Sequence, residues 1–452
     1  MFKRIQKLHF IGIGGIGMSG IAELLLNLGY HVSGSDLKQS QATERLGSLG
    51  GEIHIGHSPA NIKDANVVII SSAVHADNIE VIEARKLQIP IIPRAEMLAE
   101  LMRLKYGIAI AGSHGKTTTT SMIATVLVNG GFDPTAVIGG RLNAFGSNAK
   151  LGNGDFLVAE ADESDGSFLK LSPAVAVVTN IDREHLDYYE NLSKIQDAFV
   201  TFANKVPFYG TAILCFDDPG VRSIIPKIGR RVVTYGTDDQ SDLTASRIEF
   251  LNFGSSCQVQ YKGIPLGILR LCVPGKHGIL NALAAVATGL ELEIPFHKIA
   301  AALESFQNAD RRFQVRGEKR GVLVVDDYGH HPTEIIATLR AARQACNRRI
   351  VAIFQPHRYT RMQALEEDFA RAFDDADFLV VLPIYAAGEQ PIPGISAERL
   401  IARIKGLGHP EAVYADDFSK AQQILKDALC EGDLLLTLGA GDVWRVGEEY
   451  LS

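Results

Sequence analysis

A short loop near the middle of this chain combines residues that could hold the phosphates of a nucleotide. Residues 112–118 read Gly-Ser-His-Gly-Lys-Thr-Thr. They follow an apolar run at residues 108–111 and precede residues 117–129, which carry apolar side chains on one helical face. This pattern predicts a buried strand, a loop and a helix. The glycines allow backbone N–H groups to approach phosphate oxygens, Lys116 can bring charge to the terminal phosphates, and the Thr117 hydroxyl can complete a magnesium shell.

The loop is shorter than the common G-x-x-x-x-G-K-[ST] pattern, because Ile110 stands where that pattern has its first glycine. A glycine-rich turn without a ligand is therefore the alternative interpretation. The order of strand, Gly-Lys-Thr and helix favours a phosphate site.

A glutamate and a histidine follow two other strand-like runs. Glu160 ends the run at residues 156–159, and His185 comes shortly after the run at residues 174–181. A carboxylate at the end of a buried strand near a phosphate loop suits magnesium, which keeps phosphate and water ligands beside a few protein oxygens. His185 could reach a second metal ion or a phosphate; the alternative is a surface histidine.

A second glycine-rich loop lies near the N-terminus. Gly12, Gly14 and Gly17 follow a strand-like run in G-x-G-x-x-G spacing, a helix is expected to about residue 27, and Asp36 follows the next strand at residues 30–35. This is the outline of a dinucleotide-binding unit, in which an acidic side chain meets a ribose. The same glycines serve any ligand whose pyrophosphate lies at a helix N-terminus.

Further polar residues stand at the carboxyl ends of predicted strands. Ser71 and Ser72 end the run that begins at residue 67, and Arg94 follows a short strand at residues 89–93. Open parallel sheets bind ligands at this edge, so Arg94 is either a phosphate partner or a surface charge. His277 and Asn281 are four residues apart on a helix predicted to run through residue 290, where they could contact a purine base or merely cap the helix.

The last third of the chain repeats this arrangement of apolar runs and polar loops. Runs at residues 322–325, 350–354, 378–382 and 434–438 are each followed by polar residues, and residues 308–315, with a doubled arginine, look like a hinge into this segment. Metal binding by His330, His331 and His357 is disfavoured, because they lack H-x-x-x-H or H-x-x-E-H spacing. Residues 209–273 read as short β runs with little chemistry.

Length and composition set limits on the class of protein. A chain of 452 residues predicts roughly three domains. The net charge of −7 argues against nucleic-acid binding, and the five cysteines lie far apart without a C-x-x-C pair, so neither disulfides nor a zinc knuckle is indicated. No apolar run approaches the roughly 20 residues that a bilayer requires, and the first residues lack the features of a signal peptide. We expect a cytoplasmic α/β protein without membrane insertion.

Seven segments occur in a characteristic order: Gly-Ile-Gly-Gly-Ile-Gly-Met-Ser-Gly at 12–20, Gly-Ser-His-Gly-Lys-Thr-Thr at 112–118, Glu-Ala-Asp-Glu-Ser-Asp at 160–165, Asn-Ile-Asp-Arg-Glu-His at 180–185, Gly-Lys-His-Gly-Ile-Leu-Asn at 275–281, Asp-Asp-Tyr-Gly-His-His-Pro at 326–332 and Gln-Pro-His-Arg-Tyr-Thr-Arg at 355–361. With these segments the chain resembles the Mur ligase family, the ATP-dependent amide ligases of peptidoglycan assembly. The resemblance covers essentially the whole chain and is greatest to the branch that adds the first amino acid, alanine.

The resemblance implies three domains. Residues 1–106 would form a Rossmann-like domain that binds the UDP-sugar UDP-N-acetylmuramate, residues 107–310 a P-loop ATPase-like domain that binds ATP, and residues 311–452 a Rossmann-like domain that binds L-alanine. The weak dinucleotide signal at the N-terminus is thereby reassigned to the UDP-sugar diphosphate. We expect a monomer or a weak homodimer.

The resemblance also implies roles for individual residues, at the positions of this sequence that match the family's motifs. The UDP-sugar contacts are Gly14, Gly15, Ile16, Gly17, Asp36, Ser71, Ser72 and Arg94. The ATP contacts are Gly112, Ser113, His114, Gly115, Lys116, Thr117, Thr118, His277, Asn281, Arg312 and Asp327, with His277 and Asn281 at the adenine, Arg312 at the γ-phosphate and Asp327 at the ribose. Thr117 and Glu160 would ligate one magnesium ion and His185 a second. Alanine would meet Tyr328, His330, His357, Arg358 and Arg361. The implied catalytic residues are Lys116, His185, Arg312 and His330.

The implied reaction proceeds through an acyl phosphate. Several later-acting family members place a carbamylated lysine shortly after the histidine that matches His185, but residues 198–202 contain no lysine. This agrees with the alanine-adding branch and leaves open which group supports the second magnesium. The rival hypotheses are a ligase of the same family that attaches a tripeptide, a nicotinamide oxidoreductase and a non-catalytic nucleotide-binding module.

Overall fold

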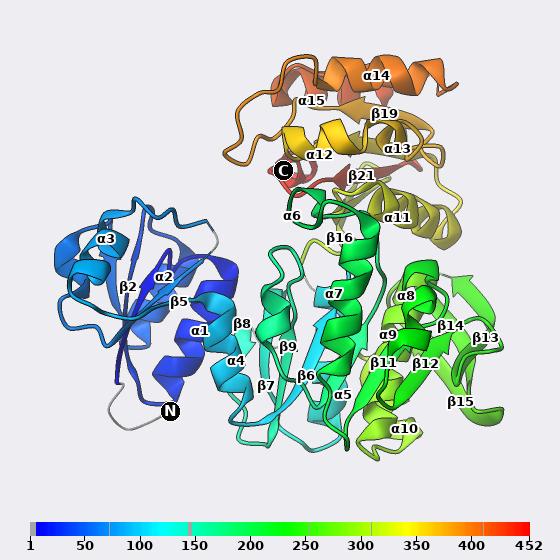
Figure 1. Cartoon of the computed structure of the whole chain (residues 1–452). Helices are drawn as coiled ribbons and strands as arrows, with labels where there is room; N and C mark the ends of the chain where they lie inside the picture. Colours follow the sequence, from blue (N-terminus) through cyan, green and yellow to red (C-terminus); the bar gives the residue numbers. More distant parts are fainter. Residues whose placement is uncertain (1–5, 72, 143–146, 252, 309, 410) are drawn as a thin grey trace. The chain divides into compact units, whose positions relative to one another are not determined.

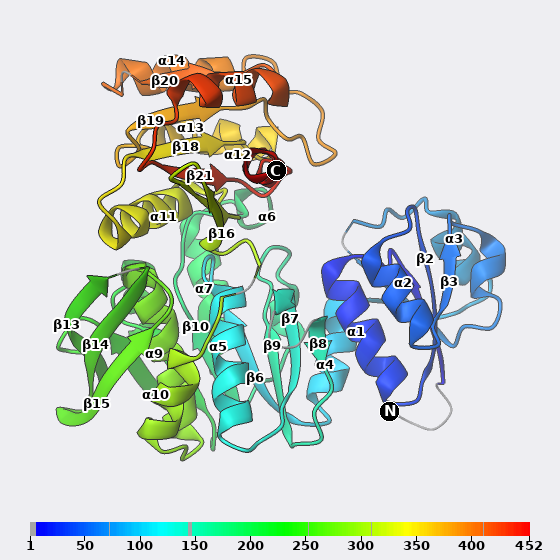
Figure 2. The same ribbon diagram turned by 180° about the vertical axis from the view of Figure 1, so that it is seen from behind.

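The computed structural model describes residues 6–71, 73–142, 147–251, 253–308, 310–409 and 411–452 (Figures 1 and 2). The strands form three sheets, and the helices connect the strands in an alternating α/β pattern. The predicted three-domain α/β class is therefore confirmed. The chain divides into two compact units, one of residues 1–246, 258–269 and 280–306, the other of residues 247–257, 270–279 and 307–452. The domain boundaries at 106/107 and 310/311 stay predictions.

The first sheet has five parallel strands in the order β3-β2-β1-β4-β5. The strands are β1 (Lys7–Ile11), β2 (His31–Asp36), β3 (Glu52–Ile55), β4 (Val67–Ile70) and β5 (Ile91–Pro93), and the helices are α1 (Ile16–Asn27), α2 (Gln41–Ser48), α3 (Ile79–Lys86) and α4 (Arg94–Met102), with the short η1 (Pro59–Ile62). The strand order reverses at β1, between β2 and β4. The loop after β1 therefore opens at the topological switch point, where such sheets bind ligands.

A buried carboxylate ties this first sheet to its helices. Glu80 in α3 has no exposed surface. It accepts hydrogen bonds from the Ser35 hydroxyl at 2.6 Å, the Asn61 amide at 2.6 Å and the Ser58 backbone N–H at 3.1 Å. Burial alone would raise the pKa of Glu80, but these donors and His9 hold that pKa at about 2.

The second sheet has ten strands in the order β15-β14-β13-β12-β11-β10-β6-β9-β7-β8. The strands are β6 (Tyr106–Ala111), β7 (Thr135–Leu142), β8 (Ser147–Lys150), β9 (Phe156–Glu160), β10 (Val175–Val178), β11 (Thr211–Cys215), β12 (Val232–Gly236), β13 (Leu243–Leu251), β14 (Gly254–Tyr261) and β15 (Ile264–Leu271). The connecting helices are α5 (Lys116–Asn129), η2 (Ser167–Lys170), α6 (Leu186–Tyr189), α7 (Leu192–Asn204), α8 (Pro219–Ile224), η3 (Ile225–Lys227), α9 (Gly275–Glu291) and α10 (Phe296–Glu304). The central strand β6 is fully apolar and buried from its second residue onward, as expected for a strand covered on both faces.

The third sheet has six strands in the order β16-β17-β21-β18-β19-β20, of which only β16 is antiparallel. The strands are β16 (Gln314–Lys319), β17 (Val322–Asp327), β18 (Ile350–Phe354), β19 (Phe378–Val381), β20 (Ala412–Tyr414) and β21 (Leu434–Leu438). The helices are α11 (Pro332–Ala345), α12 (Tyr359–Ala364), α13 (Glu366–Ala370), α14 (Ala397–Gly406), α15 (Phe418–Ala428) and α16 (Trp444–Leu451). Two core clusters cover its faces, one with side chains of α11, α13 and α14 and the other with those of α15 and α16.

Several local expectations need correction. The strand expected at residues 174–181 ends at Val178, so residues 179–182 form a loop in which Thr179, Asn180 and Asp182 are polar. The β runs expected at 209–273 are present as additional strands of the central sheet, but this segment also contains α8 and η3, which its pattern did not indicate. Pro332 begins α11 as predicted, with His331 as the N-cap. Among the described residues, no helix has both the length and the apolar character that crossing a membrane would need.

Candidate functional site

The phosphate-loop glycines occupy positions that other residues could not. Gly115 has φ +79° at the N-cap of α5, and Gly112 has φ +132°. A Cβ on Gly112 would lie 2.1 Å from the Thr179 hydroxyl, and a Cβ on Gly115 would lie 2.6 Å from Asn281 Oδ1. These contacts require glycine at both positions, and they place the predicted adenine residue Asn281 directly against the loop.

Lys116 is held by the loop and by one buried carboxylate. Its Nζ donates to the Gly112 carbonyl at 2.6 Å, to the Ser113 carbonyl at 3.3 Å and to Glu163 Oε1 at 2.8 Å. Burial alone would lower the pKa of Lys116, but the Glu163 carboxylate outweighs burial and raises that pKa. The lysine therefore keeps its charge at neutral pH, as phosphate binding requires.

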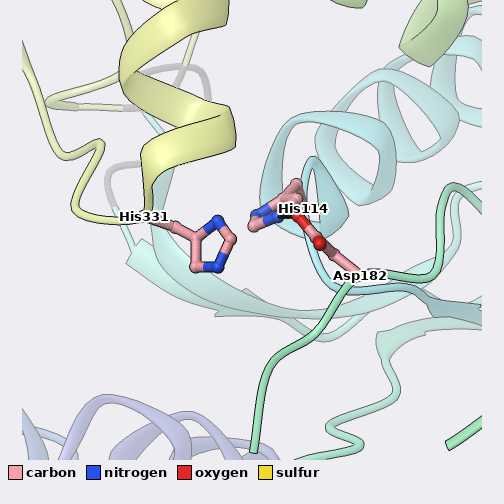
Figure 3. Close-up of side chains that lie close together, drawn as sticks. All are labelled: His114, Asp182 and His331. Carbon is pink, nitrogen blue, oxygen red and sulfur yellow. Dashed lines mark hydrogen bonds and ion pairs between the residues drawn. The ribbon is translucent and has the colours of Figure 1, made fainter. Parts of the chain in front are cut away.

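The loop after β10 fixes the backbone of the phosphate loop. The Asn180 side chain accepts from the His114 backbone N–H at 2.8 Å, and the Ser113 hydroxyl accepts from the Asp182 backbone N–H at 2.9 Å. The imidazole of His114 lies beside the carboxylate of Asp182, with 2.9 Å between Nε2 and Oδ2 (Figure 3). Sequence reasoning expected His114 at the nucleotide but did not foresee this pairing.

The predicted magnesium ligands lie at neighbouring strand ends. Thr117 is buried in the first turn of α5, and Glu160, half-buried, is the last residue of β9, level with Ile110 in β6. His185 has φ +54°, a strained conformation for a non-glycine residue, and its Nε2 lies 3.8 Å from Glu184 Oε2 and 3.9 Å from Glu163 Oε1. The Thr117 hydroxyl and the Glu160 carboxylate are oxygen ligands of the kind that Mg²⁺ prefers, whereas the printed contacts of His185 are with Glu163 and Glu184.

Two other residues predicted to bind ATP, His277 and Asp327, lie on α9 and at the end of β17. His277, on α9, is half-buried, and burial together with the charge of Arg312 lowers the pKa of His277 to about 4, so its imidazole is neutral at pH 7. Asp327 accepts hydrogen bonds from the backbone N–H groups of Phe313 and Gly329, both at 2.7 Å. Burial raises the pKa of Asp327 to about 6. Because a carboxylate offers about four lone-pair sites, Asp327 keeps capacity for a further donor.

Four of the five residues predicted to contact the alanine substrate form one group, together with one further aromatic ring. The His330 ring lies 5.4 Å from the Tyr328 ring and 5.6 Å from the His357 ring, and Arg361 Nη1 lies 3.2 Å from His357 Nδ1. The ring of Tyr385, which sequence reasoning missed, stacks on His357. Burial first, then the charges of His330 and the arginines, lowers the pKa of His357 to about 3, so this imidazole stays neutral.

The structure also describes the surroundings of Arg358, of the three histidines in the disfavoured metal alternative, and of Arg312. Arg358 has φ +69° and precedes α12. The three histidines of the disfavoured metal alternative have different environments, because His331 caps α11 and accepts from the Thr333 backbone N–H, whereas His330 contacts His357. Arg312 lies 5.2 Å above the Tyr328 ring and 3.9 Å from Glu334 Oε1.

The N-terminal glycine loop is held by Asp36 and lies beside Arg94, and so differs from the central loop, which carries its own lysine. Gly12 has φ +77°, and the Gly14 backbone N–H donates to Asp36 Oδ2 at 2.9 Å. A Cβ on Gly17 would lie 2.6 Å from Arg94 Nη1, so the guanidinium lies at the first turn of α1. Asp36 is the last residue of β2 rather than the residue after it, and its carboxylate holds the loop backbone.

The remaining predicted contacts at this loop are less informative. Gly15 is exposed as the N-cap of α1, and the Ser71 hydroxyl lies near Gly12. Arg94 Nη2 donates to Asp162 Oδ2 at 3.3 Å, so the arginine is paired rather than a lone surface charge. Ser72 lies outside the described residues, as does the side chain of Ile16.

The fold and these sites define a nucleotide-phosphate-binding α/β enzyme. Three family models match the chain: "Mur ligase family, catalytic domain" at residues 7–106, "Mur ligase middle domain" at 110–289 and "Mur ligase, glutamate ligase domain" at 311–441. The chain belongs to the Mur ligase family.

Individual relatives are similar over the full length. The UDP-N-acetylmuramate--L-alanine ligase of Geotalea daltonii is 60% identical over 100% of this chain and 98% of the relative, and that of Geotalea uraniireducens is 58% identical over 99% and 98%. The crystal structure of the UDP-N-acetylmuramate-alanine ligase MurC from Thermotoga maritima matches with a TM-score of 0.83 at 31% identity, covering 98% of each chain. A murein peptide ligase from Psychrobacter arcticus, at 24% identity and a TM-score of 0.71 over 99% of this chain and 98% of its own, shares the fold.

Proposed function

We propose that this protein joins L-alanine to the lactyl carboxylate of UDP-N-acetylmuramate, at the expense of ATP, giving ADP and phosphate in peptidoglycan precursor synthesis. The observation that carries the proposal is the phosphate loop with Lys116 at the N-terminus of α5, in a chain about as long as its relatives and up to 60% identical to ligases of that name. The proposal includes a cytoplasmic location and a monomer or weak homodimer.

The first glycine loop would bind the UDP-sugar diphosphate. Its backbone N–H groups lie at the start of α1, where the helix dipole favours negative charge. Arg94 adds a guanidinium beside Gly17, and the Asp36 carboxylate keeps the Gly14 N–H in place. Ser71, which follows β4, and Ser72, which lies outside the described residues, complete the proposed contacts.

The second glycine loop would bind the ATP phosphates. Residues 112–118 supply backbone N–H groups and Lys116 its ammonium, while Asn281 lies against Gly115 and suits the adenine together with His277. Thr117 and Glu160 would hold one magnesium ion and His185 a second, and such ions neutralise phosphate charge. Arg312, Asp327 and the group around His330 and His357 keep the roles that the family resemblance implies.

The reaction has two steps. The muramate carboxylate attacks the γ-phosphorus of ATP, and the bond between this phosphorus and the β-γ bridging oxygen breaks. The products of this step are ADP and an acyl phosphate of the muramate. The neutral amine of alanine then attacks the acyl carbon, and the tetrahedral intermediate expels inorganic phosphate as the amine loses a proton. The protein contributes mainly position and positive charge, which the loop N–H groups, Lys116 and arginines provide. An arginine would pair with the alanine carboxylate.

The direct test is ADP release with UDP-N-acetylmuramate and one of L-alanine, glycine, L-serine or the tripeptide of the recycling ligases. We expect turnover with L-alanine and weaker turnover with the other small amino acids, since one methylene changes the binding free energy by only about 1–3 kcal/mol. Turnover with the tripeptide alone would contradict the proposal, as would tight binding of a nicotinamide cofactor without ADP release.

A further inference from the structure

The two histidines of the alanine group, His330 and His357, carry their ring hydrogens on different nitrogens. His330 Nδ1 lies 3.1 Å from the Tyr328 carbonyl oxygen and 3.5 Å from Glu334 Oε2. Carbonyl and carboxylate oxygens only accept hydrogen bonds, so His330 Nδ1 carries a hydrogen. In the neutral imidazole the lone pair then lies on the other nitrogen, Nε2.

The contacts of His357 are of the opposite kind. Arg361 Nη1 lies 3.2 Å from His357 Nδ1, and a guanidinium only donates, so Nδ1 accepts and the ring hydrogen lies on Nε2. A second proton on this ring would have to enter at Nδ1, against an arginine. Accordingly burial, together with the charges of His330, Arg361 and Arg358, holds the pKa of His357 at about 3. His357 is therefore a hydrogen-bond donor that takes up no proton at neutral pH.

The surroundings of His330 stabilise a positive charge on its ring. Glu334 lies in the first turn of α11, and its Oε2 also accepts from the backbone N–H groups of His330 at 3.0 Å and His331 at 3.2 Å, so the carboxylate is held beside the ring. Arg312 lies 3.9 Å from the other oxygen, Oε1. The His357 ring, 5.6 Å away, is neutral. A carboxylate beside the donating nitrogen orients an imidazole and stabilises its protonated form.

The second step of the proposed reaction needs a proton acceptor. Alanine in neutral solution is an ammonium, whose nitrogen has no lone pair with which to attack an acyl phosphate. One proton must therefore leave before the attack. A useful acceptor is neutral in the free enzyme and has its protonated form stabilised by its neighbours. Of the two histidines, only His330 meets the second condition.

We propose that His330 is the general base that activates alanine. Its Nε2 takes one proton from the ammonium, and the neutral amine forms a bond to the acyl carbon. The tetrahedral intermediate breaks its bond to the phosphate oxygen, the second amine proton goes to the departing phosphate, and His330 releases its proton to solvent. This inference rests on the proposed function, which supplies the alanine and the acyl phosphate.

The test compares two nucleophiles on the full chain with ATP and UDP-N-acetylmuramate. Hydroxylamine is largely neutral near neutral pH, so it needs no base and converts an acyl phosphate to a hydroxamate. With alanine, His330→Gln should lower kcat by about 10²–10⁴-fold, the usual contribution of general-base catalysis. With hydroxylamine, hydroxamate formation should stay within about threefold of wild type, because the step that His330 assists is bypassed. The alanine rate of the variant should rise with pH, since more of the amine is then neutral in solution.

Further comparisons keep the test decisive. His297→Gln, at an exposed position of α10, is the matched control and should react like wild type with both nucleophiles. An equal loss with both nucleophiles in His330→Gln would overturn the inference, as would an undiminished rate with alanine. If His330→Gln does not fold, His330→Asn decides by the same comparison, because its amide keeps an N–H near the position of Nδ1. Absence of hydroxamate from wild type would instead contradict the proposed function.

Discussion

Two buried glutamates, Glu80 behind the N-terminal glycine loop and Glu163 behind the central one, differ in how completely the protein satisfies them. Glu80 accepts hydrogen bonds on both oxygens, from Ser35 on one and from Ser58 and Asn61 on the other. Glu163 has one oxygen on Lys116 and one without a hydrogen-bond partner among the described residues. Accordingly the pKa of Glu80 lies at about 2, whereas burial raises the pKa of Glu163. A saturated buried carboxylate contributes to the stability of the fold, whereas a half-satisfied one carries the cost of an unpaired buried oxygen.

The two glycine loops also differ in how their charged groups are paired. The N-terminal loop offers backbone N–H groups fixed by Asp36, and its nearest cation, Arg94, is already paired with Asp162. The central loop carries its own lysine, whose charge partner lies in the next loop of the same sheet. The first arrangement suits the binding of a diphosphate that stays intact, and the second suits phosphates whose charge changes during a reaction.

The largest effect should follow Lys116→Ala. We expect kcat to fall by about 10²–10³-fold, because an electrostatic contact to the reacting phosphate is lost. Steady-state ADP release measures it. Lys194→Ala, in an exposed pair with Glu190, is the matched control and should leave kcat unchanged. A fall in kcat of less than tenfold would show that the lysine of the central loop does not act on the reacting phosphate.

Glu80→Gln should reduce stability rather than turnover per folded chain. The folded-state pKa of about 2 lies below the unfolded value, so the carboxylate contributes stability above about pH 4.5, up to about 3 kcal/mol, which is lost as pH falls towards 2. The gap in unfolding free energy between wild type and Glu80→Gln, from urea titrations, should therefore narrow from pH 5 to pH 3.

Glu83→Gln is the control for this prediction, because Glu83 lies on the same helix and pairs with the exposed Lys86. Its gap to wild type should be small at every pH. A gap for Glu80→Gln that is independent of pH would mean that the carboxylate is not the stabilising form.

Asp36→Ala should raise the KM for UDP-N-acetylmuramate by about tenfold and change kcat little, since a charge-assisted hydrogen bond to the loop contributes about 1.5–3 kcal/mol. Initial rates at varied UDP-sugar and saturating ATP provide the measurement. The exposed Asp77, changed to Ala, is the control. If the KM for ATP rose instead, the N-terminal loop would bind ATP and the assignment of the two loops would be wrong.

The smallest effect should come from Lys170→Ala. Lys170 pairs with Glu96 at 2.8 Å, as Lys116 pairs with Glu163, but both partners are more than 40% exposed. We expect the free energy of unfolding to change by less than about 0.5 kcal/mol, because solvent screens the pair. Thermal unfolding checks it, and a loss above 2 kcal/mol would mean that burial does not distinguish the two pairs.

Much of this organisation was predictable from the sequence. Glycine spacing and apolar runs identified both loops and the strands before them, since these patterns are local. The partners of Asp36 and Glu163 were not predictable, because they depend on how loops from separate strands meet. Glu80 resembles an ordinary helix residue in the sequence, and only the fold brings Ser35, 45 positions away, to its carboxylate. The roles assigned to the site residues stay predictions.

The central claim is that the two glycine loops bind different phosphate groups independently. Calorimetric titration of Lys116→Ala with UDP-N-acetylmuramate and, separately, with a non-hydrolysable ATP analogue tests it most directly. We predict a Kd for the UDP-sugar within about twofold of wild type and a Kd for the ATP analogue raised at least about tenfold, as expected for the loss of a charged hydrogen bond. Loss of binding for both ligands would contradict the claim, because it would place the UDP-sugar at the central loop.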